Sequence, residues 1–224
     1  MNPSPEIIFE DDFLLVINKP IGWVVNEADT TKNQKTIQNW LREKGLPNIG
    51  ERFGIVHRLD KETSGVLLVA KTEEAFIEMQ RQFKSREVAK VYLAVVHGKV
   101  SPETGEINAP IDRNPFNRMR FGVFPGGREA VTKYQVLKST TEISLLELHP
   151  LTGRTHQIRV HLKHLGYPII GDELYGGRKN IQEDKKTDQR MLLHAWKINF
   201  FHPQTKEKVT FEAPIPQEFN KTIS

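Results

Sequence analysis

Apolar and polar positions along this chain group into short runs, which predicts a fold built mainly from strands. The runs "FLLVINKP" (13–20) and "GVLLVAK" (65–71) are bounded by Gly, Pro or charged residues, and their Val and Leu content favours central strands. Five further strands are predicted, of which the last four form two pairs: "KVYLAVVHGKV", "AVTKYQVLK", "EISLLELHP", "MLLHAWKINFFHP" and "KVTFEAP". Because the elements do not repeat a strand–helix–strand order, we expect an α+β fold around a mixed, mostly antiparallel sheet, flanked by helices and loops.

One helix is predicted directly after the second apolar run. Thr72 followed by two glutamates is a typical helix start, and Phe76, Met79 and Phe83 then share one face of a helix that ends near Arg86.

A second helix is predicted within residues 154–168, where two periodicities compete. The alternating apolar residues from 158 to 162 fit a strand, whereas Ile158, Leu162 and Leu165 recur at helical spacing. The "GYP" that follows at 166–168 is typical of a helix end and favours the helix. On that helix the stem of Arg159 is packed while its guanidinium emerges at the edge of the core. Residues 178–190 are polar throughout and predict a flexible surface loop.

Composition indicates a globular protein. The 224 residues are 38% hydrophobic and 27% charged, so we expect a single domain, residues 1–224, with its own core. The chain has no cysteine, which excludes disulfides, thiolate metal sites and a cysteine nucleophile. No apolar run approaches the roughly 18 residues of a membrane span, and the N-terminus lacks a signal-peptide pattern. We therefore expect a cytoplasmic protein without a membrane partner.

Positive charge is concentrated in two segments, although the net charge is only +4. Residues 111–133 carry five Lys or Arg against two acids, with three phenylalanines among glycines, and predict a basic, aromatic loop. Residues 154–164 carry three further cations, three histidines and no acid. Taken alone, each segment is most simply a solvated face; together they could form one surface for a polyanion.

Asp60 lies in "HRLDKETSG" (57–65), between an expected strand "GIVHRL" (54–59) and the apolar run at 65–71. The sequence Asp-x-x-Thr-Ser-Gly is good turn chemistry, with a carboxylate that caps backbone N–H groups and Gly65 in an unusual conformation. Alternatively, a carboxylate with Arg58 close by stays ionised in a partly dry cleft and serves as nucleophile or base. Local physics alone favours the turn.

The segment "HRLDKETSG" also closely resembles the signature of the RluA-type family of RNA pseudouridine synthases. The blocks "NKPIGWVV", "KVYLAVVHG", "GGREAVTKYQVL", "HPLTGRTHQIRVHLKHLGYPIIGDELYG" and "LLHAWKINFFHP" resemble that family's blocks in the same order, over about residues 8–215. Many relatives carry a small RNA-binding domain before the catalytic one. This chain resembles the catalytic domain alone.

The resemblance implies that uridine is isomerised to pseudouridine in structured RNA, ribosomal or transfer, by a monomer without cofactor or metal. The uridine must be flipped into a pocket, in an active-site cleft that crosses the sheet. Asp60 is then the catalytic carboxylate, either a nucleophile at the sugar carbon or a base that takes the 2′ proton. Tyr92 would stack on the detached uracil and assist proton transfer, although without the family match it is most simply a half-buried strand aromatic.

Arg159 would pair with Asp60 and keep it anionic, and Ile158 would form an apolar wall of the pocket. The remaining residues that we expect to hold the RNA are His57, Arg58, Arg154, Arg113, Arg118 and Arg120.

Other functions stay open on the residues alone. A non-catalytic RNA-binding module would not need Asp60, Tyr92 and Arg159 together, and a glycoside hydrolase would need a second carboxylate, for which Glu62 is the nearest in sequence. The histidines at 156, 161 and 164 do not have the spacing of one metal site on a helix, so we expect structural or RNA-facing roles for them.

Overall fold

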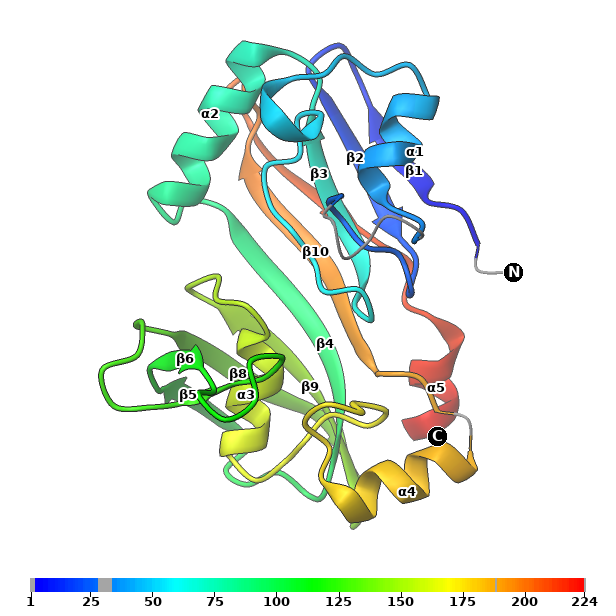
Figure 1. The fold of residues 1–224 in the computed structure, drawn as a ribbon, viewed down its shortest axis with the longest axis vertical. Coiled ribbons are helices and arrows are strands. Elements are labelled where there is room, and N and C mark those ends of the chain that lie inside the picture. The colour runs from blue at the N-terminus through cyan, green and yellow to red at the C-terminus, as the bar shows by residue number, and fades with distance from the viewer. Residues whose placement is uncertain (1–2, 28–33, 188, 224) are drawn as a thin grey trace. The chain divides into compact units, whose positions relative to one another are not determined.

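A computed structural model describes residues 3–27, 34–187 and 189–223. The chain forms two compact units: unit 1 comprises residues 1–90 and 195–214, and unit 2 comprises residues 91–194 and 215–224. The chain leaves unit 1 within strand β4 (Ala89–His97) and returns to it within strand β10 (Leu193–Phe201) (Figure 1). That the chain is one domain stays a prediction.

Unit 1 is built on strands in the order β1-β2-β3-β10, with β11 paired to β10. The bounds are β1 (Glu6–Glu10), β2 (Leu14–Lys19), β3 (Ser64–Ala70) and β11 (Lys208–Glu212). The pairs β1–β2, β2–β3 and β10–β11 are antiparallel. Both apolar runs expected to form central strands are confirmed, because β2 and β3 each have neighbours on both sides and every residue of β3 is buried.

The helices of unit 1 are α1 (Ile37–Glu43), the 3-10 turn η2 (Gly50–Arg52) and α2 (Glu73–Lys84). The sequence correctly predicts α2 and its cap, since the Thr72 hydroxyl accepts a hydrogen bond from the Ala75 N–H at 3.2 Å. Ala75 and Met79 face a core that contains Leu68 of β3 and Phe200 of β10.

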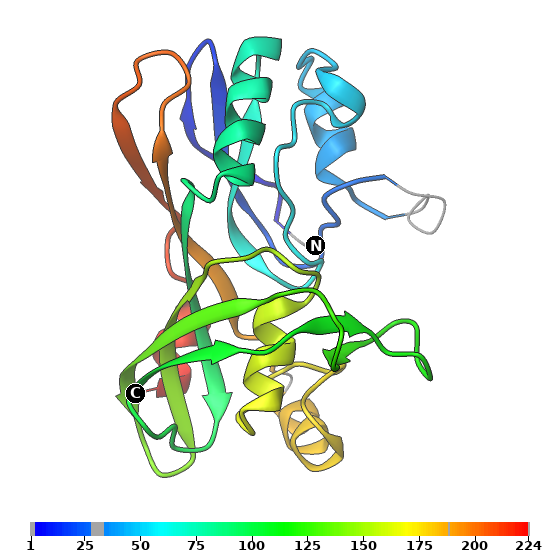
Figure 2. The same cartoon turned by 90° about the vertical axis from the view of Figure 1, so that its left-hand side faces the viewer.

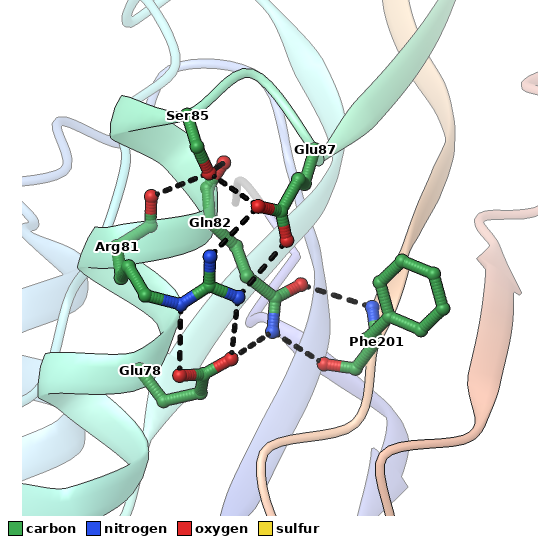
Figure 3. A network of polar contacts seen from close by, with 6 residues as sticks. All are labelled: Glu78, Arg81, Gln82, Ser85, Glu87 and Phe201. Carbon is green, nitrogen blue, oxygen red and sulfur yellow. Dashed lines mark hydrogen bonds and ion pairs between the residues drawn. The ribbon is translucent and has the colours of Figure 1, made fainter.

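The C-terminal half of α2 is tied to the end of β10 by polar contacts (Figure 3). The Gln82 side chain donates to the Phe201 carbonyl at 2.7 Å and accepts from the Phe201 N–H at 2.9 Å, as a neighbouring strand would. Beside it, the Arg81 guanidinium lies between Glu78 and Glu87 and donates to both. These contacts fix the helix against the sheet independently of its apolar face.

Unit 2 is built on strands in the order β4-β9-β8-β5, and a separate pair, β6-β7, forms a hairpin. The bounds are β5 (Thr104–Asn108), β6 (Ile111–Arg113), β7 (Phe121–Val123), β8 (Val131–Ser139) and β9 (Ile143–Pro150). The helices are α3 (Gln157–His164), α4 (Arg178–Lys186) and α5 (Gln217–Ile223). The antiparallel β8–β9 and β10–β11 pairs are confirmed, as is the α+β class.

Helix α3 confirms the choice of helix over strand at 154–168. Ile158 and Leu162 pack with Ala94 of β4 and Leu146 of β9, and the helix is followed by Gly166 at φ +93°.

Three expectations need correction. Residues 178–186 form a helix, α4, and not a flexible loop. This helix is held by polar contacts and therefore lacks the apolar stripe from which a helix is predicted. The Asp184 carboxylate is buried and accepts a hydrogen bond from the Gly171 N–H at 2.8 Å. The segment expected to be a basic loop contains the short strands β6 and β7.

Residues 54–59 do not form the expected strand. Ile55 makes a single bridge to Val69, and the Leu68 N–H donates instead to Nε2 of His57 at 3.0 Å. An imidazole nitrogen thus replaces the main-chain partner that a strand would supply. Within the described part of the chain, no helix is long and apolar enough to cross a membrane.

Candidate active site

Asp60 lies in unit 1, in a turn that leads into β3. The Thr63 N–H donates to the Asp60 carbonyl at 3.1 Å, and Thr63 and Ser64 are buried. Gly65 has φ +114°, and a Cβ there would lie 2.1 Å from the Ala195 carbonyl oxygen, so only glycine fits. The unusual conformation expected for Gly65 is confirmed. The turn therefore holds Asp60, which is half-buried, at a fixed end of a buried strand.

A buried lysine for which no role was predicted supports this turn. Lys19 is fully buried at the end of β2, and its Nζ donates to the carbonyl oxygens of Pro20, Trp23 and Lys61 at 3.0, 3.0 and 3.2 Å. Lys61 directly follows Asp60, so the ammonium fixes the backbone of the turn. Burial lowers the pKa of Lys19 to about 7, although the carboxylates of Glu62 and Asp60 act in the opposite direction. A charged residue inside an apolar run was the available signal.

His57 has an internal role in unit 1. Its Nε2 accepts from the Leu68 N–H, and its ring stacks on Phe83 with centroids 5.0 Å apart. Burial, and secondarily the Lys90 ammonium, lowers the pKa of His57 to about 3. The imidazole is therefore neutral with its proton on Nδ1. An RNA contact of His57 stays a prediction, as does that of the neighbouring Arg58, whose side chain is exposed.

Arg159 lies on α3 of unit 2 and binds a carboxylate that the sequence analysis did not identify. Its Nε donates to Oδ2 of Asp172 and its Nη2 to Oδ1, both at 2.8 Å, and both side chains are buried. Oδ1 of Asp172 also accepts from the N–H groups of Leu174 and Tyr175 at 3.0 Å. Such a two-pronged ion pair fixes the plane of the guanidinium. The expected pairing of Arg159 with Asp60 stays a prediction. An acid among glycines in "IIGDELYG" was the only sequence signal for Asp172.

Tyr175 connects this ion pair to the β6–β7 hairpin. The Arg159 guanidinium carbon lies 5.0 Å from the centre of the Tyr175 ring. The Tyr175 hydroxyl accepts from the Phe121 N–H of β7 at 2.8 Å and is hydrogen-bonded to Nδ1 of His156 at 2.9 Å. Two residues missed by the sequence analysis, Asp172 and Tyr175, thus surround the cation that it singled out.

Tyr92 and Ile158 lie at the same core cluster of unit 2. Tyr92 stands on β4 opposite Leu148 of β9, and its half-buried ring packs against the cluster that contains Ile158. Ile158 is buried, next to Arg159 in the first turn of α3. The structure therefore brings together three of the predicted residues in unit 2, whereas Asp60, Arg58 and His57 belong to unit 1.

The predicted RNA-binding arginines of unit 2 differ in how firmly they are held. Arg113 of β6 donates from Nη1 to the Arg118 carbonyl at 2.5 Å, and its guanidinium covers the Phe121 ring at 4.9 Å. Arg154 donates from Nε to the Glu129 carbonyl at 2.9 Å. Arg118 and Arg120 have exposed side chains.

The histidines of α3 do not share one environment. His161 is fully buried, with Nδ1 bound to the Thr132 hydroxyl at 2.9 Å and Nε2 to the Ala109 carbonyl at 3.0 Å. Burial lowers its pKa, partly offset by the Ala109 carbonyl, so it is a neutral structural residue, as expected. His164 is exposed. Among the described residues, no group of three or more His, Cys, Asp or Glu is arranged to hold a metal ion.

Comparisons with known proteins match nearly the whole chain. Residues 13–164 match the family model described as RNA pseudouridylate synthase. The chain is 40% identical over 222 residues to the uncharacterized RNA pseudouridine synthase YlyB of Bacillus subtilis, and this match covers 97% of this chain and 71% of that protein. It is also 40% identical over 218 residues to the ribosomal large subunit pseudouridine synthase D of Nitrosomonas europaea, covering 95% of this chain and 62% of that protein. The solved structure of human RNA Pseudouridylate Synthase Domain Containing 1 superimposes with a TM-score of 0.75 at 30% identity, covering 96% of this chain and 86% of that one.

Proposed function

This chain belongs to the family of RNA pseudouridylate synthases, and from this premise we propose that it isomerises uridine to pseudouridine in ribosomal RNA of the large subunit, with Asp60 as its catalytic carboxylate. The relative from Nitrosomonas europaea carries that substrate in its name, although this chain spans 62% of it. A ribosomal RNA substrate is found where ribosomes assemble, so we expect the chain to act in the cytoplasm. We also propose that it acts as a monomer.

The reaction needs no net oxidant or added group. The glycosidic C–N bond of uridine breaks, the uracil turns, and its C5 forms the new bond to C1′ of the ribose. The proton that leaves C5 and the one that N1 gains keep the atoms in balance. A carboxylate serves this sequence as a nucleophile at C1′ or as a base at the 2′ position, and either role needs an ionised and fixed Asp60.

The rigidity of the Asp60 turn is the observation that supports this assignment. Gly65 is locked against the Ala195 carbonyl, and the Lys19 ammonium binds the carbonyl of the residue after Asp60. A reacting group must be held within a fraction of an ångström to be effective, and a turn with such supports meets that need. A mere surface turn would not require a buried cation beneath it.

Tyr92 and Arg159 complete the proposed catalytic set. Tyr92 offers a half-buried ring for stacking on the detached uracil and a hydroxyl for proton transfer. Arg159 would keep Asp60 ionised, since a guanidinium is always charged and the ion pair with Asp172 fixes its plane.

Binding of RNA is proposed to supply the free energy that extrudes the uridine from its stack, a cost of a few kcal/mol. The residues that would contact the RNA are Arg58, Arg154, Arg113, Arg118 and Arg120, together with His57 and the apolar wall formed by Ile158. Phosphate contacts of this kind are independent of sequence and weaken as salt rises.

The test is the Asp60→Asn variant with Glu62→Gln as its control. The two carboxylates lie two residues apart in one turn, so both amides change charge equally and keep side-chain size. Turnover is followed as tritium released from RNA labelled at C5 of uridine, because that hydrogen leaves only when C5 bonds to the sugar. We expect Asp60→Asn to abolish release while RNA affinity and folding are kept, and Glu62→Gln to retain most of the activity.

Each contrary result identifies another function. Substantial tritium release by Asp60→Asn would refute the catalytic assignment, and loss of folding would favour a purely structural turn. If the unaltered chain released free uracil and both variants failed to do so, the chain would be a glycoside hydrolase with two carboxylates. If the unaltered chain bound large-subunit ribosomal RNA but released no tritium from it, the chain would be a binding module. The comparisons do not favour that alternative.

A further inference from the structure

The tip of the β6–β7 hairpin, residues 114–120 with the sequence "NPFNRMR", presents two large apolar side chains to solvent. Phe116 is 97% exposed and Met119 is 73% exposed, more than any other large hydrophobic residue in the described part of the chain. Arg118 and Arg120 alternate with Met119 and are exposed as well. Figure 2 shows the green hairpin extending away from the strands of its unit.

This tip is ordered by its own hydrogen bonds. The Asn114 side-chain oxygen accepts from the N–H groups of Phe116 at 2.8 Å and Asn117 at 3.1 Å. The Asn117 side chain accepts in turn from the Met119 N–H at 3.1 Å. Backbone bonds of 2.9 Å from Asn114 to Arg120 and from Arg120 to Asn117 close the turn. The Phe116 ring is thus held outside by a preorganised turn, so a partner would bind it at a reduced entropic cost.

The base of the hairpin is anchored equally well. Arg113 bridges the two sides of the turn by donating to the Arg118 carbonyl and lying over the Phe121 ring. The Phe121 N–H is bound to the hydroxyl of Tyr175, the residue stacked under Arg159. The tip is therefore an extension of the framework that positions Arg159.

The chemistry around Phe116 indicates the class of its partner. A single exposed phenylalanine needs no explanation. Here the ring shares a seven-residue turn with two exposed arginines, and no acid occurs anywhere from residue 113 to 128. An aromatic face next to cations complements a nucleic acid strand, in which a flat base alternates with an anionic phosphate.

We propose that Phe116 is a stacking site for an unpaired nucleobase of the RNA, distinct from the uridine that reacts. Met119 packs beside the same base, and Arg118 and Arg120 neutralise the adjoining phosphates. This inference rests on the proposed action on RNA. Stacking on an aromatic ring accepts any base, so the site selects an unpaired nucleotide and not a sequence.

The test compares Phe116→Ala with Phe116→Trp and with Ile77→Ala, a control in which a residue 64% exposed on α2 is truncated. The probe is a ten-nucleotide single-stranded RNA with 2-aminopurine at its centre, whose fluorescence falls when the base stacks. A duplex of the same length and a strand that is abasic at all ten positions serve as reference ligands.

We expect Phe116→Ala to weaken binding of the single strand by about 5- to 150-fold, the range measured for loss of one base–aromatic stack. Phe116→Trp should keep the affinity and the quenching, and Ile77→Ala should leave both unchanged. The duplex and the abasic strand should bind Phe116→Ala and the unaltered chain alike. The dependence of affinity on salt should not change, since no charge is removed.

Other outcomes would overturn the stacking site. Equal loss of single-strand and duplex affinity would indicate a general disturbance of the hairpin, and unchanged single-strand affinity would exclude stacking. A dimer that dissociates in Phe116→Ala, with RNA binding intact, would assign the ring to a second copy of the chain. Because these assays measure binding, they are independent of Asp60: if Asp60→Asn still releases tritium, the stacking result stands by itself.

Discussion

The ion pair between Arg159 and Asp172 provides a sharp test of how unit 2 holds its proposed catalytic cation, through the substitution Asp172→Asn. The amide keeps the volume of the carboxylate. Its oxygen can still accept from Nη2 of Arg159 and from the N–H groups of Leu174 and Tyr175, which meet Oδ1 in the structure. At the second position an NH₂ group replaces Oδ2 and faces Nε of Arg159, so two donors oppose each other.

The magnitude follows from the burial of the pair. The side chains of Arg159 and Asp172 are 8% and 1% exposed, so water does not replace the lost carboxylate charge. Removal of one partner from a buried ion pair costs about 3–5 kcal/mol, because an uncompensated charge is left behind. The matched control is Glu173→Gln in the next position. Its carboxylate, 74% exposed and 3.1 Å from Lys185, should contribute about 0–1 kcal/mol.

The assay must report on unit 2. All three tryptophans, at 23, 40 and 196, lie in unit 1, so tryptophan fluorescence follows that unit. We therefore expect the effect in hydrogen exchange of peptides that span residues 157–176, where Asp172→Asn should lower protection by at least about 100-fold. Turnover should fall through kcat, because the orientation of Arg159 is lost, while affinity for RNA is kept. If Asp172→Asn and Glu173→Gln had equal effects on exchange, the reasoning from burial would be refuted.

Two further predictions concern charge. Replacing both Arg118 and Arg120 by alanine should lower the slope of log affinity against log salt by about 1.4 to 1.8, the value for two phosphate contacts. A salt titration with any structured RNA measures this slope. An unchanged slope and affinity would show that these residues do not contact the RNA. Since the pKa of Lys19 is about 7 in the folded chain and 10.5 otherwise, the unfolded state binds more protons between these values, so the free energy of unfolding should rise from pH 7 towards pH 10, by up to about 1.4 kcal/mol per pH unit. Urea unfolding followed by tryptophan fluorescence should show this rise, smaller in Lys19→Met, and a flat profile would contradict the lowered pKa.

Elements with strong periodicity could be predicted from the sequence. The uninterrupted apolar run of β3 and the spacing of Phe76, Met79 and Phe83 behind the Thr72 cap agree with the structure, in which Met79 is buried and both phenylalanines pack against the same core. Helix α4 could not be predicted in this way. Its buried carboxylate, Asp184, is held by the Gly171 N–H, and a contact between residues 13 apart leaves no periodic signal. The same holds for residues 54–59, where the His57 side chain takes a hydrogen bond that main chain would otherwise make.

The candidate site shows a similar division. Asp60, Tyr92 and Arg159 were assigned because they match a family pattern, whereas the groups that fix two of them were not. Asp172 and Lys19 act through geometry: one by a two-pronged ion pair, the other by three hydrogen bonds to carbonyl oxygens. Neither residue type is unusual in composition, and only the fold shows that each is buried.

The two buried groups explain how a chain can place polar chemistry at the edge of a packed core. A charge withdrawn from water is unfavourable unless its hydrogen-bonding capacity is met, and both Lys19 and Arg159 meet theirs with fixed oxygens. Because each loses its partners if the local backbone moves, each also penalises any displacement of the neighbouring turn or helix. The cost of burying each charge is thus offset only while the Asp60 turn in unit 1 and α3 in unit 2 keep their positions. An apolar residue in either place would pack as well, but it would not resist such a displacement so steeply, because dispersion contacts are non-directional and hydrogen bonds to fixed carbonyl and carboxylate oxygens are directional.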